Sequence, residues 1–184
     1  GAVQVMIHNA AVGQRAFAAD SAYDIDDVIM RTNYLGPVAL TKAVLPSMRA
    51  RRDGHFIVVS SVLGKFGLPG RSAYCASKHA LHGFFDTLRA EVAKDNIHVT
   101  LALPGWVRTN ISMNALTGTG APQRKMDSGT ATGFAPEYCA ERILAAAEVA
   151  KDEVNIVRLK EQAVLYLSRF TPSIFRRLIR GRGI

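Results

Sequence analysis

The chain has 184 residues, of which 48% are hydrophobic, so it is long enough to bury the core of one domain. No apolar stretch approaches the roughly eighteen residues of a membrane-spanning helix, and no signal-peptide pattern is visible. The formal net charge is +8, and residues 169–184 contribute five arginines and no acidic residue to it. Because the remainder is only mildly basic, we expect no nucleic-acid partner.

The cysteines and the first residues give two further expectations. Cys75 and Cys139 have neither metal-ligand nor redox spacing, so we predict no metal site and expect a reducing compartment. The chain begins with Gly1-Ala2-Val3-Gln4, which is unlike a native N-terminus. We therefore expect further sequence upstream, which is also where an anchor would lie.

The first part of the chain predicts a strand followed by a long helix. Residues 3–7 are an apolar run typical of a strand in a parallel sheet, and His8, Asn9 and Ala10 follow its end. Residues 24–50 carry acidic residues in the first turn and apolar residues at helical spacing, which predicts one helix.

Three residues in or near this helix deserve separate interpretation. Asn33 is a poor helix former in an interior position, so it is either an exposed or capping residue or one with a specific function. Pro46 removes a helix hydrogen bond and is expected to bend the C-terminal end. Gly54 follows several arginines and is expected to close the helix.

The middle of the chain holds the residues around which the rest is organised. Residues 56–59 are apolar and β-branched, which predicts a buried strand, and Ser60 and Ser61 follow at its end. Open α/β sheets bind their ligands at that end. A loop rich in glycine and proline leads to Tyr74 and Lys78, whose i, i+4 spacing places both side chains on one face of the next helix.

This pair predicts acid/base chemistry. A tyrosine phenol has a pKa near 10, and a neighbouring ammonium lowers that pKa because it favours the phenolate. Tyr74 would then act as a general acid/base at neutral pH, while Ser61 holds a carbonyl or alcohol oxygen. The alternative is that Tyr74 and Lys78 belong to an ordinary solvated helix face.

The second half repeats the pattern of helix and strand. The predicted elements are a helix from about 74 to 94, strands at 97–103 and 154–159, a helix at 137–150, and one or two basic, apolar helices within 160–182. Residues 110–136 show no persistent helical pattern and are either a lid, a binding loop or a disordered segment. The alternation predicts an α/β fold, a parallel sheet with helices on both faces.

Several of these motifs together resemble the signature of the short-chain dehydrogenase/reductase family. The motifs are the Asn9-Ala10 turn, Ser61 thirteen residues before Tyr74-Cys75-Ala76-Ser77-Lys78, and the turn Pro104-Gly105-Trp106-Val107-Arg108-Thr109. The resemblance implies a Rossmann-like fold in which Tyr74 is the acid/base, Lys78 tunes its pKa and binds the nicotinamide ribose, and Ser61 orients the substrate oxygen. It also implies that Asn33 holds a water in a proton path to Lys78.

The resemblance further implies NAD or NADP as the cofactor, with NADP preferred. Asn9 would stabilise the central sheet, and Ala10 would lie along the cofactor. Pro104 and Gly105 begin the turn in which the Val107 backbone and the Thr109 hydroxyl would take the carboxamide. The family's glycine-rich phosphate-binding turn does not occur before Asn9, so the chain resembles a Rossmann domain that lacks its first strands and that turn.

We predict two parts. Residues 1–162 form the C-terminal part of the Rossmann domain, with a substrate lid at 110–136, and residues 163–184 form a basic amphipathic extension. The extension resembles the dehydrogenase/reductase member 7B branch of the family, which is membrane-associated. Residues 163–182 would lie on a membrane surface, cover the substrate entrance, or pack on the domain with their arginines in water.

The sequence thus supports three hypotheses for function. The first is an NAD(P)-dependent oxidoreductase that interconverts a carbonyl and an alcohol on a lipophilic substrate. The others are a catalytically silent interaction protein of the same fold and a peripheral membrane protein. The resemblance also leads us to expect a homodimer and an intracellular location, either cytoplasmic or at the endoplasmic reticulum membrane. This chain alone is expected to be inactive, because the phosphate site is missing.

Overall fold

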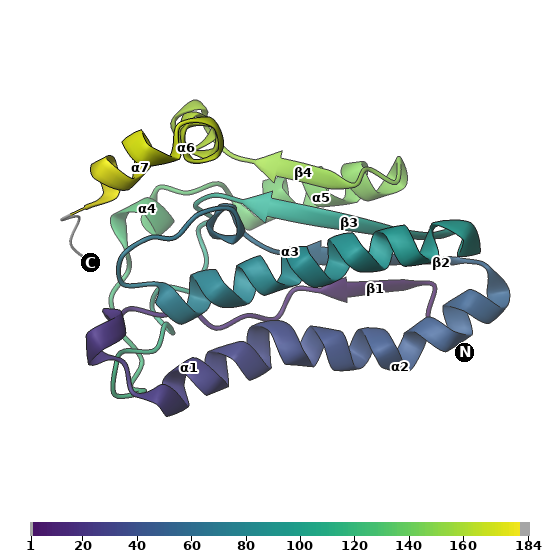
Figure 1. The fold of residues 1–184 in the computed structure, drawn as a ribbon, viewed down its shortest axis with the longest axis horizontal. Helices are drawn as coiled ribbons and strands as arrows, with labels where there is room; N and C mark the ends of the chain where they lie inside the picture. The colour runs from purple at the N-terminus through teal and green to yellow at the C-terminus, as the bar shows by residue number, and fades with distance from the viewer. Residues whose placement is uncertain (1, 181–184) are drawn as a thin grey trace.

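The computed structural model describes residues 2–180 and contains one parallel sheet with helices on both of its faces. The strands are β1 (Val5–His8), β2 (Gly54–Val59), β3 (Ile97–Pro104) and β4 (Glu153–Ile156), in the spatial order β1-β2-β3-β4 (Figure 1). Each neighbouring pair is parallel. The predicted α/β class is therefore confirmed.

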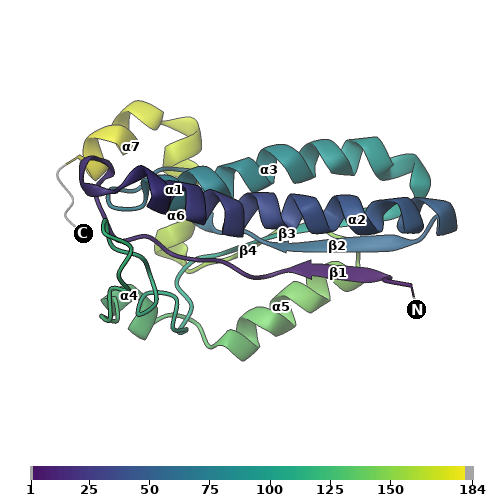
Figure 2. The same cartoon turned by 90° about the horizontal axis from the view of Figure 1, so that it is seen from below.

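The helices divide between the two faces of the sheet. The helices α1 (Tyr23–Met30), α2 (Gly36–Arg51) and α3 (Ser72–Val92) lie on one face, and α5 (Pro136–Glu148) lies on the other (Figure 2). The main core packs Met48 and Phe85 from the helices against Phe56 and Leu101 of the sheet. A smaller core joins Cys139 and other α5 residues to β3 and β4. Burial of these apolar side chains is the main force that fixes the layers.

The expected long helix is present, but its middle is wound differently. Between α1 and α2 the backbone forms a π-helical turn, Arg31–Leu35, which contains Asn33. π-helical turns inside α-helices are frequent at functional sites. Pro46 lies inside α2, and the helix continues past it to Arg51.

Gly54 has a different role from the predicted helix stop. The left-handed residue after α2 is Arg52, with φ 54°, and Gly54 already begins β2. A Cβ at Gly54 would lie 2.5 Å from the sulfur of Met48. The glycine therefore serves close packing between the sheet and α2, and not the helix end.

The last strand is shorter than predicted. It ends at Ile156, and α6 (Leu159–Phe170) begins where we expected the strand to finish. The Glu161 carboxylate accepts a hydrogen bond from the backbone N–H of Arg158 at 2.6 Å, which satisfies a free donor at the helix start. This cap starts α6 at Leu159. The two C-terminal helices, α6 and α7 (Pro172–Ile179), therefore occupy the predicted range of 160–182, except that α6 begins just before it.

The carboxyl ends of the strands meet at one end of the molecule, together with the irregular segments (Figure 1). Residues 110–136 include the four-residue helix α4 (Ser128–Ala131), and Leu116 forms single bridges with Gln14 and Pro122. In residues 2–180, no helix combines the length and the apolar character needed to cross a membrane.

The edge strand β1 generates a testable prediction. Val5 and Ile7 of β1 are about half exposed. The helix α5, which covers their face of the sheet, packs on β3 and β4 and leaves β1 open. An apolar edge strand offers unpaired backbone groups to another chain. We expect the chain to self-associate, and Val5→Lys with Ile7→Lys to reduce that association in sedimentation velocity. Leu144→Lys on α5 with Val149→Lys directly after it is the matched control, and equal effects of the two pairs would contradict a role for β1.

Candidate active site

Ser61, Tyr74 and Lys78 come together where β2 ends and α3 begins. Ser61 lies close enough to the Tyr74 phenol for its hydroxyl to lower the pKa of that group, and Ser61 Oγ accepts from the Leu63 backbone N–H at 3.2 Å. Lys78 Nζ lies 5.7 Å from the centre of the Tyr74 ring and donates to the Val59 carbonyl at 2.9 Å. The three side chains predicted from spacing therefore form one cluster.

Burial controls the protonation of this cluster. It raises the pKa of Tyr74 above its ordinary value, although the Ser61 hydrogen bond and the charges of Arg15 and Arg71 oppose the rise. Burial also lowers the pKa of Lys78 to about 8. We expected Lys78 to hold the Tyr74 pKa down, but in this structure desolvation of the phenolate wins.

Asn33 is buried, which excludes the alternative of an exposed residue and leaves the alternative of a specific function. Its Oδ1 accepts from the Val12 N–H at 2.7 Å, and its Nδ2 donates to the Val12 carbonyl at 2.9 Å. Nδ2 also donates to Ser77 Oγ at 3.1 Å, and that hydroxyl donates to the Tyr74 carbonyl. The π-helical turn thus fixes the loop after β1 to the start of α3.

The residues predicted to hold a cofactor lie along the same end of the sheet. Asn9 and Ala10 are exposed just beyond β1, whereas Pro104 is buried at the end of β3. Val107 pairs with Phe134 through a single parallel bridge. The Thr109 hydroxyl accepts from the Ile111 N–H at 3.4 Å, and Gly105 N–H donates to the Ile156 carbonyl at 3.0 Å.

The side chain of Gln14, which sequence reasoning missed, holds the first turn of α3. Gln14 Oε1 accepts from the N–H groups of Ala73 at 2.8 Å and Tyr74 at 3.4 Å. Its Nε2 donates to Ser21 and Asp26, both at 3.2 Å. The sequence around Gln14 gives no sign of this contact, because the backbone N–H groups that it binds lie about sixty residues further along the chain.

Two arginines and one carboxylate join three loops beside Tyr74. Arg15 Nε donates to Asp127 at 2.9 Å, and Arg71 donates to the same carboxylate oxygen at 3.3 Å. The side chains of Arg15, Arg71 and Asp127 are only 7%, 9% and 19% exposed. We call this cluster the arginine clasp, because it ties residues 110–136 to the loop after β1 and to the start of α3.

The clasp carries one positive charge more than its carboxylate balances. Burial, together with repulsion from Arg15, lowers the pKa of Arg71 to about 10. Burial alone would raise the pKa of Asp127, but hydrogen bonds from Arg15 and Gln123 outweigh it, and the pKa is lowered. The excess charge lies close enough to Tyr74 to oppose the rise in its pKa.

His82 supports the other side of the site, behind Ser61. Its Nε2 lies 3.1 Å from the hydroxyl oxygen of Ser60, and burial lowers its pKa to about 4, so it is neutral at pH 7. Its Nδ1 has no hydrogen-bond partner within the described part of the chain, with Glu153 Oε2 at 3.9 Å. A Cβ at Gly64 would lie 2.7 Å from the His82 ring, so this tight junction between β2 and α3 requires glycine.

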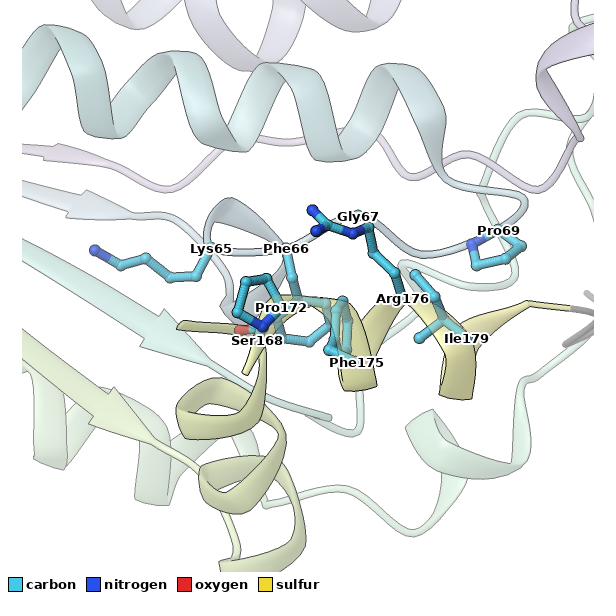
Figure 3. Close-up of a pocket in the computed structure, with 9 residues that line it drawn as sticks. All are labelled: Lys65, Phe66, Gly67, Pro69, Ser168, Pro172, Phe175, Arg176 and Ile179. Carbon is cyan, nitrogen blue, oxygen red and sulfur yellow. The ribbon is translucent and has the colours of Figure 1, made fainter. Parts of the chain in front are cut away.

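A surface pocket of about 430 Å³ lies between the loop after Ser61 and α7 (Figure 3). Phe66, Pro69, Phe175 and Ile179 supply its apolar lining. Since Ser61, Tyr74 and Lys78 do not line it, it is separate from the chemical cluster.

The arginine clasp predicts a pH-dependent loss of stability. Asp127→Asn leaves two guanidinium groups without their carboxylate and should cost about 2 kcal/mol of unfolding free energy at pH 7. Because the Asp127 pKa is lowered in the folded chain, its stabilisation is present above the unfolded pKa of about 3.9 and is lost as the pH falls through the folded value. The difference between variant and parent in urea unfolding should therefore shrink below about pH 4.

Asp27→Asn is the matched control for this prediction. Asp27 pairs with Arg31 on the surface of α1, one helical turn away, so its replacement should cost less than about 0.5 kcal/mol. Equal costs for the two variants would show that the clasp contributes no more than a surface pair.

Comparisons with known proteins agree with this geometry. Residues 1–119 match the family described as short chain dehydrogenase. A dehydrogenase/reductase SDR family protein 7-like of Anopheles gambiae is 48% identical over all of this chain and 58% of its own length. Dehydrogenase/reductase SDR family member 7B of Bos taurus is 46% identical over all of this chain and 56% of its own length. The chain thus spans a little more than half the length of these relatives.

Two solved structures have the same fold. A short-chain dehydrogenase from Streptomyces avermitilis superposes with a TM-score of 0.76 at 26% identity, covering 97% of this chain and 68% of that one. A short chain dehydrogenase from Burkholderia cenocepacia, solved in complex with NADP, gives a TM-score of 0.78 at 24% identity, covering 96% and 68%. With its matching family, its relatives and its cluster of Ser61, Tyr74 and Lys78, the chain belongs to the short-chain dehydrogenase/reductase family.

Proposed function

We propose that the protein is an NAD(P)-dependent oxidoreductase that interconverts a carbonyl and an alcohol, with Tyr74 as the acid/base. The observation that carries this proposal is the cluster of Ser61 and Tyr74 with the buried Lys78, whose ammonium nitrogen lies over the Tyr74 ring at 5.7 Å from its centre. Two hydroxyls that meet at the carboxyl end of a central strand can both reach one substrate oxygen.

Ser61 and Tyr74 have different roles at that oxygen. Ser61 holds it by a hydrogen bond, and Tyr74 gives it a proton when the carbonyl is reduced or takes a proton when the alcohol is oxidised. Because burial raises the Tyr74 pKa, the phenol is protonated at neutral pH and ready to donate. A nicotinamide cofactor, when bound, would supply the hydride chemistry at the substrate carbon in either direction.

The residues present fit the nicotinamide end of such a cofactor. Lys78 uses one ammonium donor for the Val59 carbonyl, which leaves donors for ribose hydroxyls. Asn9 and Ala10 are exposed at the same end of the sheet as the turn that contains Val107 and Thr109, with β2 between the strands that they follow. The NADP complex of the Burkholderia cenocepacia relative in fold supports a nicotinamide cofactor, and we propose NAD or NADP, with NADP preferred.

We further propose that residues 110–136 form the substrate lid and that the substrate is lipophilic. The arginine clasp supports a lid, because it fixes Asp127 beside the start of α3. Met113, Leu116 and Met126 supply partly exposed apolar groups within this segment. Phe134 instead packs near Tyr138 and under Arg158, which favours a role in lid packing.

A catalytically silent protein of the same fold is the alternative. If the protein is catalytically silent, replacement of Tyr74 should not change the turnover of any bound ligand. The buried Lys78 argues against it, since burying a charged side chain without a carboxylate partner costs stability that a silent protein need not sustain.

The acid/base role predicts a large kinetic effect. In a protein of the full length of its relatives, Tyr74→Phe should lower kcat by about two to four orders of magnitude. Tyr23→Phe, on the exposed start of α1, is the matched control and should turn over normally. Near-normal turnover by the Tyr74 variant would remove Tyr74 from the mechanism.

The missing phosphate site predicts weak cofactor binding by residues 1–184 alone. Backbone N–H groups at a helix N-terminus usually receive the pyrophosphate, and the nicotinamide contacts alone must oppose the cost of immobilising a large charged molecule. Titration calorimetry with NADH and NADPH should detect no binding at micromolar concentrations. A micromolar Kd for either would show that another segment of this chain holds the phosphates.

A further inference from the structure

The two C-terminal helices pack on the domain through only part of their apolar surface. Leu165 of α6 and Phe175 of α7 are buried, and the Phe175 ring lies edge-on to Phe66 with 5.2 Å between the ring centres. Figure 3 shows Phe175 and Ile179 of α7 turned toward the loop that holds Phe66 and Pro69. These contacts hold α7 on the domain and leave the rest of its surface exposed to solvent.

That remaining surface is apolar at four positions. Tyr166 and Phe170 of α6, and Ile174 and Leu178 of α7, are each more than half exposed. Within each helix the two residues are four apart, so they are neighbours on one face, and the Tyr166 and Phe170 rings stack with their centres 6.1 Å apart. The two helices contact each other, and we call their four exposed apolar residues together the C-terminal docking face.

The charges around this face have a single sign. Arg169, Arg176, Arg177 and Arg180 are exposed, and the sequence from 162 to 180 contains no acidic residue. Among residues 2–180, none of these four arginines forms an ion pair. Exposed Leu, Ile and aromatic side chains beside arginines are the composition of a helix that lies in the membrane interface.

We propose that the C-terminal docking face binds the surface of an anionic membrane, with α6 and α7 lying in the plane of the interface. The helices have 12 and 8 residues, too short to cross a hydrocarbon layer of about 30 Å. The apolar side chains enter the boundary between headgroups and acyl chains, while the arginines extend along it to lipid phosphates.

The charge pattern selects a membrane over a second copy of this chain. A twofold interface would place the same patch on both partners, so the arginines would face arginines without any carboxylate from this segment. An anionic lipid surface instead offers negative charge at every position. The proposal concerns binding alone, so it can fail or succeed independently of the oxidoreductase activity.

Vesicle flotation with the complete 184-residue chain tests the proposal. The vesicles contain phosphatidylcholine alone or with about one third phosphatidylserine, and flotation separates bound protein from aggregates, which sink. We expect flotation with the anionic vesicles only, and partition should weaken at high salt because the arginine attraction is screened.

Two variants separate the apolar and the charged contributions. Ile174→Ser with Leu178→Ser should weaken partition at least tenfold, and Arg177→Gln with Arg180→Gln should weaken it about 25-fold, roughly fivefold for each arginine. The matched controls are Leu144→Ser with Val149→Ser, and Lys42→Gln with Arg142→Gln, which change exposed residues on α2, on α5 and directly after α5. Both controls should bind as the parent does.

Three results would overturn the proposal. The first is no flotation with anionic vesicles. The second is equal partition by the docking-face variants and their controls. The third is loss of self-association in the docking-face variants without any vesicle binding by the parent, which would assign the face to a second copy.

Discussion

The position of the first turn of α3 determines the geometry of the site, and a single side chain from another part of the chain holds that turn. Arg71 precedes the helix but gives no side-chain cap, so the free N–H groups of Ala73 and Tyr74 need another acceptor. Gln14 Oε1 supplies it, and Gln14 Nε2 is itself held by Ser21 and Asp26. Because Gln14 is fully buried, this acceptor has no competition from water.

The electrostatics of the site follow from that burial. Desolvation of the partly buried Tyr74 raises its pKa, and desolvation of the buried Lys78 lowers its pKa to about 8. Arg15 and Arg71 act against the first shift, because their two charges face one Asp127 carboxylate. The arginine clasp is therefore both a mechanical link to residues 110–136 and a source of positive potential beside the phenol. The positive potential opposes the rise in the Tyr74 pKa but does not cancel it, so the phenol stays protonated at neutral pH.

The sequence predicted the parts of the fold that depend on local patterns. Apolar β-branched runs identified the strands, and i, i+4 spacing placed Tyr74 next to Lys78. Gln14, Arg15 and Asp127 could not be found in this way, because polar residues in loops look alike whether they are solvated or bound to a distant partner. The end of β4 was misplaced for a related reason: Leu159 continues an apolar run, but the Glu161 cap decides in favour of a helix.

The two incompletely covered surfaces of the molecule differ in the partner that their chemistry can accept. At β1, the exposed groups are apolar side chains and an open backbone edge, so a further strand is the natural complement. On α6 and α7 the backbone is already satisfied within the helices, and only apolar side chains and arginines remain available. Such a surface cannot be extended by pairing, and its uniform charge disfavours a copy of itself. A negatively charged surface that also accepts apolar side chains complements both the arginines and the exposed apolar residues, and a lipid interface is such a surface.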